Sequence, residues 1–183
     1  TGLNLPDFGI SRDNALADIR RMAGAFVLVR NSPQLAEMCA DLGARVITVS
    51  QGGYDTHSDQ LDNHADLLAD LDGGIKALYQ NMSPVFRSRV VVMTYTEFGR
   101  RVERSDSAGT DHGTSSVMFL VGDHVRGGFA SDAPSLTVLD SRGDLNVTTD
   151  VRSVFATVLD DWLDADHAEI LGASYPKLSL FEA

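Results

Sequence analysis

Three short polar segments, each beside an apolar run with the composition of a β-strand, constrain the fold of this chain more than any other feature. They are the YDTH segment at 52–60 beside 44–49, the EFGR segment at 96–100 beside 90–94, and the TDHG segment at 110–113 beside 117–121. Asp, Glu, His and Arg side chains cluster poorly unless a ligand compensates their charges. The pattern therefore predicts strands whose ends carry a metal or anion site.

Segments with helical periodicity separate these strands. Apolar residues recur at helical spacing over the ranges 12–30, 33–42, 58–80, 151–163 and 166–171. Asp150 is placed to cap the helix at 151–163, and the sequence at 141–144 predicts a hairpin between 136–139 and 145–148. Strands alternating with helices predict a layered α/β domain with a central, mixed sheet.

The order of strand and polar segment predicts which side chains meet. Asp55 and His57 follow one strand and Glu97 and Arg100 follow the next, so both pairs belong at the carboxyl ends of strands, where ligands bind in open α/β sheets. The TDHG segment precedes its strand. It reaches the same edge only if 117–121 runs antiparallel to 90–94, and the connection over 99–114 is long enough for that return.

Composition excludes several classes of protein. A length of 183 residues with 43% hydrophobic residues fits one domain over 1–183 with a sizeable core. The net charge of -11 argues against a nucleic-acid partner, because phosphate binding needs clustered Lys and Arg. No apolar stretch approaches the ~20 residues of a membrane span. Cys39 is the single cysteine, which excludes a disulfide framework and a Cys-rich zinc site.

The residue types in the polar segments indicate the chemistry of the site. Asp55, His57, Glu97, Asp111 and His112 offer oxygen and imidazole ligands, a set suited to a divalent metal such as Zn, Mn, Mg or Ca. Arg100 has a planar fork that matches two oxygens of a phosphate, sulfate or carboxylate. These residues predict a metal site with an arginine clamp for an anionic substrate.

Each segment is also compatible with a structural role. Residues 55–57 can form a turn before a helix capped by Ser58 or Asp59. Glu97 and Arg100 can pair at helical spacing, and 111–113 can form an ordinary turn. If all three segments are turns, the chain is a structural or interaction domain.

Read in order, the motifs resemble a known family. These motifs are GGYDTHSDQ, VVVMTYTEFGRRV, GTDHG with VMFLVG, RGGF and TTDVRSVFATVLDDWL. Together they are similar to DUF1501, a bacterial family that is sulfatase-like and belongs to the alkaline phosphatase superfamily. The resemblance extends from about Leu42 to Phe181. It implies a three-layer, alkaline-phosphatase-like sandwich with a central mixed, mainly parallel sheet.

The resemblance also implies a set of ligands. In that superfamily an Asp and a His follow one strand, an acidic residue with a His follows the next, and a further His precedes a later strand. Asp55 and His57 match the first pair, Glu97 matches the acidic ligand, and His112, with Asp111 beside it, matches the late His. This chain departs from the pattern in two places: Phe98 stands where the second His usually does, and the spacing between Asp55 and His57 is shorter than usual. Asp111 and His112 also match the Asp–His pair of the second strand, so the assignment of the motifs has two alternatives.

The activity implied is metal-dependent hydrolysis of sulfate or phosphate esters, either small anionic esters or sulfated or phosphorylated polymers. Superfamily members place a Ser, Thr or modified Cys nucleophile in an N-terminal part, and Cys39 matches no such motif. The chain is thus expected to be the C-terminal part of a longer sulfatase-like domain. The alternative is a non-catalytic member that binds a metal or polyanion. Relatives commonly carry twin-arginine leaders, which implies export to the periplasm.

Overall fold

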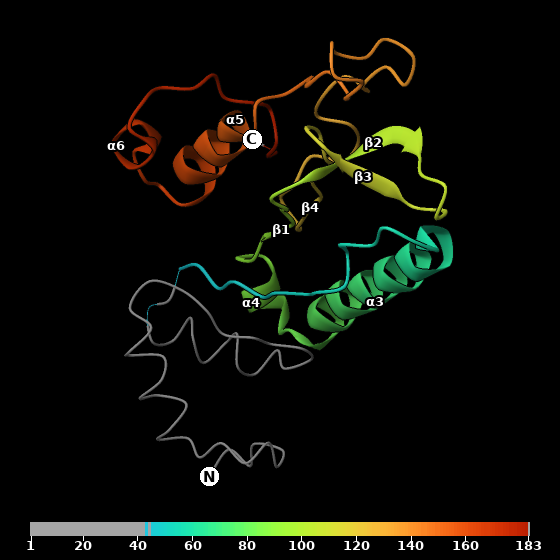
Figure 1. Ribbon diagram of the computed structural model, residues 1–183. Coiled ribbons are helices and arrows are strands. Elements are labelled where there is room, and N and C mark those ends of the chain that lie inside the picture. The colour runs from blue at the N-terminus through green and yellow to red at the C-terminus, as the bar shows by residue number, and fades with distance from the viewer. Residues whose placement is uncertain (1–42, 44, 183) are drawn as a thin grey trace. The chain divides into compact units, whose positions relative to one another are not determined.

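The computed structural model describes residue 43 and residues 45–182 (Figure 1). The chain divides into two units, Thr1–Gln51 and Gly52–Ala183. The helices predicted at 12–30 and 33–42 lie outside the described residues. Over 45–49 the predicted strand at 44–49 does not form; an apolar run becomes a strand only where a neighbouring strand completes its backbone hydrogen bonds.

The longest helix of the second unit is α3, Gln60–Asn81, which the periodicity over 58–80 predicts. It continues through Gly73 and Gly74 despite their low helix propensity. Near its end the Tyr79 hydroxyl lies 2.6 Å from the carbonyl oxygen of Val121 and 3.1 Å from that of Val90. These contacts attach α3 to the neighbouring strands, and a short helix, α4 (Pro84–Arg87), follows it.

Two antiparallel strand pairs follow α3 and α4. β1 (Val92–Met93) pairs with β4 (Leu120–Val121), which confirms the antiparallel return that the TDHG segment requires. Both strands are shorter than the predicted runs at 90–94 and 117–121. β2 (Gly99–Arg104) pairs with β3 (Thr110–Gly113), and Arg100 lies opposite His112. The connection at 99–114 is therefore a hairpin.

Local sequence signals explain the C-terminal part. Leu139 and Leu145 form an antiparallel bridge around a turn in which Gly143 has φ 82°, as the predicted hairpin requires. Helix α5, Val151–Thr157, continues as a π-helical turn, Val158–Trp162. Helix α6, His167–Leu171, ends at Gly172 in the left-handed conformation.

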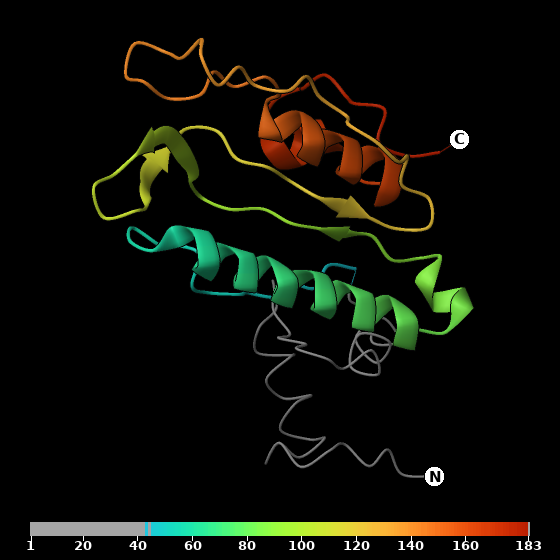
Figure 2. The same cartoon turned by 90° about the vertical axis from the view of Figure 1, so that its right-hand side faces the viewer.

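The helices of the second unit cover both sides of the β1–β4 pair. Figures 1 and 2 show α3 on one side and α5 on the other. Val154 and Ala156 of α5 are buried, as are Met82 after α3 and Leu180 near the C-terminus. Both sheets among the described residues have two strands, so the three-layer sandwich with a mainly parallel sheet stays a prediction. Within the described part, no helix has the length and apolarity of a membrane span.

The cap of α5 gives a pH-dependent prediction. The Asp150 carboxylate accepts from the Arg152 backbone N–H at 2.9 Å and from the Arg152 guanidinium at 2.6 Å. The guanidinium bond, then the backbone bond, lowers the pKa of Asp150 to about 2. The stability this group contributes is present above its unfolded pKa and lost as pH falls through about 2. Carboxyl chemical shifts of Asp150 should titrate there, and Arg152→Ala should return the midpoint toward the ordinary value; an unmoved midpoint would exclude Arg152 as the cause.

Candidate metal centre

Asp55, His57 and His112 form a cluster of possible metal ligands. Asp55 Oδ1 lies 3.0 Å from His57 Nε2 and 2.7 Å from His112 Nε2. One donor atom from each of the three residues lies within 4.8 Å of the other two. Two predicted ligands from the YDTH segment and one from the TDHG segment thus converge, although the segments are far apart in the chain.

Hydrogen bonds from and to Ser107 join the YDTH segment to the hairpin that carries the TDHG segment. Asp59 N–H donates to the Ser107 carbonyl at 3.1 Å, and the Ser107 hydroxyl donates to the His57 carbonyl at 2.6 Å. The turn of the β2–β3 hairpin is therefore attached directly to the segment that carries Asp55. Asp59 itself has φ 45° and makes no capping bond to α3, so the alternative in which Asp59 caps the helix is wrong.

A glycine makes this close approach possible. A Cβ on Gly109 would lie 2.3 Å from the carbonyl carbon and oxygen of His57. Any side chain at this position would force the hairpin away from the YDTH segment. Gly109 belongs to the GTDHG run of the family resemblance, but the sequence did not identify it as a residue that holds the site together.

The cluster is open to solvent. The exposed fractions of the side chains are 64% for Asp55, 50% for His57 and 43% for His112. Hydrogen bonding from His112 is the main cause that lowers the pKa of Asp55, with a smaller contribution from His57. Asp55 is thus an ionised carboxylate between two imidazoles, accessible to an ion and to a substrate.

Asp111 lies beside the second nitrogen of His57. Its Oδ1 is 3.5 Å from His57 Nδ1, whereas Asp55 approaches Nε2 of the same ring. Asp111 is outside the three converging donors. A carboxylate in this position typically orients a ligating histidine.

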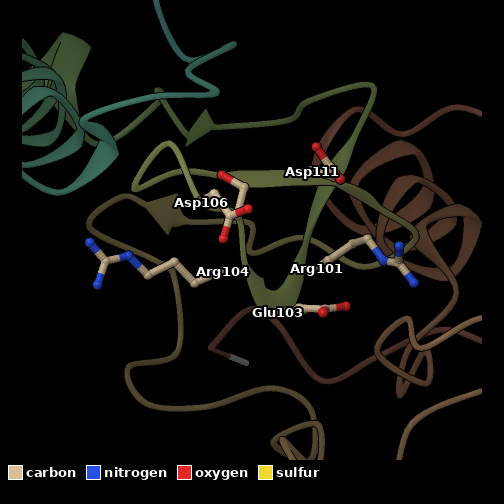
Figure 3. Close-up of a pocket in the computed structure, with 6 residues that line it drawn as sticks. Arg101, Glu103, Arg104, Asp106 and Asp111 are labelled. Carbon is tan, nitrogen blue, oxygen red and sulfur yellow. The ribbon is translucent and has the colours of Figure 1, made fainter.

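Asp111 also borders an open depression of about 340 Å³, with Arg101, Glu103 and Asp106 among the lining residues (Figure 3). The side chains of Arg101 and Arg104 extend to opposite sides of it in Figure 3. These two arginines therefore do not form a clamp for one anion.

Glu97, a predicted metal ligand, lies apart from the cluster, and its neighbour Phe98 contacts the cluster instead. Glu97 is exposed at a bend before β2 and lies outside the three converging donors. Phe98, in contrast, stacks on His112 with ring centroids 4.0 Å apart and an angle of 2° between the planes. Phe98, and not Glu97, is thus the residue of the EFGR segment that stacks on His112.

Arg100 bonds to the backbone of two polar segments. Its Nη1 donates to the Thr110 carbonyl and its Nη2 to the Tyr54 carbonyl, both at 2.6 Å. The guanidinium also lies 5.1 Å from the centroid of the Phe98 ring. Arg100 therefore connects all three polar segments, a role that residue type alone did not reveal. A guanidinium has five N–H donors, so these two bonds leave others for an anion.

Arg100→Lys is expected to destabilise the second unit by about 1–2 kcal/mol, because one ammonium cannot reach both carbonyls and a charged hydrogen bond contributes about that much. Thermal unfolding measures the loss, with exposed Arg126→Lys as the matched control. Equal stability of Arg100→Lys and the control would exclude the bracing role. Weaker binding of phosphate or sulfate by folded Arg100→Lys would support the predicted clamp.

Comparisons with known proteins identify a family but no characterised relative. The family model described as "Protein of unknown function (DUF1501)" matches residues 17–172. Searches of curated proteins and of solved structures found no match. The matched region contains the YDTH, EFGR and TDHG segments.

Proposed function

The chain belongs to the DUF1501 family of proteins of unknown function, and we propose that it is a metal-dependent hydrolase of sulfate or phosphate esters, or the C-terminal part of one. The observation that carries the proposal is the convergence of Asp55, His57 and His112. Three protein ligands with solvent access are typical of catalytic metal sites, whereas structural sites are closed by four. The resemblance to sulfatase-like proteins supplies the substrate class.

The three donor atoms fit a divalent metal ion, and they suit Zn²⁺ better than Ca²⁺ or Mg²⁺. Two imidazole nitrogens and one carboxylate oxygen suit Zn²⁺, while Ca²⁺ and Mg²⁺ are usually bound by oxygen ligands alone. Asp55 is ionised, as a ligand must be. We therefore propose Zn²⁺ as the ion that Asp55, His57 and His112 would hold.

A bound Zn²⁺ would supply Lewis-acid chemistry, polarising an ester oxygen and lowering the pKa of water. The residues of the chain position the reactants. His57 and His112 both approach the Asp55 carboxylate oxygen through their Nε2 atoms, and Asp111 lies next to the remaining nitrogen of His57. Arg100 is the proposed partner of the ester oxyanion, through the N–H groups not bonded to Tyr54 and Thr110.

The test is turnover of a panel of aryl phosphates and aryl sulfates by the Zn²⁺-loaded protein, together with the nucleophile-bearing N-terminal part that the resemblance implies. We expect hydrolysis that a chelator and Asp55→Asn abolish and that His124→Ala, a histidine outside the cluster, leaves unchanged. Stoichiometric Zn²⁺ without turnover would contradict the hydrolase and support the alternative, a non-catalytic member that binds a metal or polyanion. Absence of bound metal would contradict the metal site and leave a polyanion-binding member or a structural or interaction domain.

A further inference from the structure

We propose that Phe98 positions His112 for metal binding, an inference that rests on the proposed metal site but not on hydrolysis. The two rings are almost parallel, 2° apart in plane, with centroids separated by 4.0 Å. The position at which Phe98 departs from the superfamily pattern is thus occupied by a residue that contacts a ligand directly.

His112 needs such a contact because it is an exposed side chain on a short strand. Its exposed fraction is 43%, and the χ2 torsion of histidine is broad, so the ring plane is weakly fixed by rotamer preference alone. Stacking restricts rotation of the plane. The restricted plane keeps Nε2 at 2.7 Å from Asp55 Oδ1, so the two donor atoms stay close enough to bind one ion.

His57 restrains the His112 ring less than Phe98 does. The centroids of the two imidazoles are 5.0 Å apart and their planes differ by 31°, a looser contact than the Phe98 stack. Fixing His112 therefore depends on Phe98 more than on the neighbouring histidine.

Phe98 is itself held in place. It precedes Gly99, the first residue of β2, and Arg100, two positions later, lies opposite His112 in the β2–β3 register. The Arg100 guanidinium approaches the Phe98 ring to 5.1 Å, and its bonds to the Tyr54 and Thr110 carbonyls fix the arginine. The ring on which His112 stacks is consequently part of a braced structure.

The experiment measures Zn²⁺ affinity by calorimetry, well below the unfolding temperature, for Phe98→Leu and Phe98→Tyr. An aromatic stack of this kind corresponds to about a three- to tenfold change in an equilibrium constant. Phe98→Leu should weaken Zn²⁺ binding by that factor, and Phe98→Tyr should restore it because the ring is retained. The matched control is Phe119→Leu, which removes a ring that is 48% exposed and outside the cluster.

A spectroscopic readout separates positioning from a general loss of structure. In the folded protein the ring protons of His112 should be shifted upfield by the Phe98 ring current, and Phe98→Leu should abolish this shift while Phe119→Leu preserves it. Equal Zn²⁺ affinity of Phe98→Leu and wild type, or His112 shifts unchanged in Phe98→Leu, would overturn the positioning role. Wild-type protein that binds no Zn²⁺ would overturn both this inference and the proposed function, whereas Zn²⁺ binding without hydrolysis overturns only the latter.

Discussion

His112→Ala is expected to lower the affinity for Zn²⁺ by more than about 100-fold, because loss even of a group that only orients a ligand costs about 10–100-fold. His112 contributes one of the three converging donors and lies 2.7 Å from Asp55. Removing the ring leaves Asp55 and His57, too few ligands to hold the ion tightly. Calorimetric titration measures the affinity and circular dichroism verifies the fold.

His124→Ala is the matched control for this substitution. His124 is exposed and lies next to Trp162, with ring centroids 6.2 Å apart, outside the cluster. We expect wild-type Zn²⁺ affinity for His124→Ala. Unchanged affinity for His112→Ala, or equal losses for the two variants, would rule out His112 as a ligand.

Gly99→Ala is expected to give the largest loss of stability, about 3 kcal/mol, the upper end of the usual cost of overpacking, by forcing a side chain into a backbone contact. A Cβ on Gly99 would lie 1.7 Å from the Ser115 carbonyl oxygen, so the chain after β3 would have to move away. Gly99 pairs with Gly113 next to the Arg100–His112 pair. Zn²⁺ binding should therefore fall together with the unfolding temperature.

Gly127→Ala is the control for Gly99→Ala, since a Cβ there meets no atom within 4 Å. Chemical denaturation of the two variants gives the comparison. Stability of Gly99→Ala equal to that of Gly127→Ala would mean that β2 and the chain at Ser115 do not approach as closely as described.

Apart from α4, the helices of the second unit could be predicted from the sequence because their signals are local. The apolar repeat over 58–80 predicts α3, and Asp150 caps α5 through a bond to a backbone N–H two residues away. Gly172 ends α6 in a conformation that glycine readily adopts. None of these signals needs knowledge of distant parts of the chain.

The strands could be predicted less well because their lengths depend on their partners. Apolar runs predicted five residues each for β1 and β4, and the paired strands have two residues each. The β2–β3 hairpin was missed because its residues are mostly polar or charged, GRRVER and TDHG. An open hairpin of this kind carries no apolar alternation that a sequence pattern could reveal.

In the candidate site, too, some features could be predicted from the sequence and others could not. Asp55, His57 and His112 were predicted from residue type and from position beside strands. The contacts of Phe98 and Arg100 could not be, since ring stacking and bonds to the Tyr54 and Thr110 carbonyls depend on register and side-chain rotation. Asp111 was predicted as a ligand and lies instead beside His57 Nδ1. Its assignment as a ligand stays a prediction.

X-ray absorption at the zinc edge of the Zn²⁺-loaded chain tests most directly whether the three polar segments form one metal site. We predict a shell with two imidazole nitrogens and one carboxylate oxygen, completed by solvent oxygen, and loss of an imidazole contribution in His112→Ala. A spectrum of the hydrated ion, or one that His112→Ala does not change, would contradict a site built from Asp55, His57 and His112.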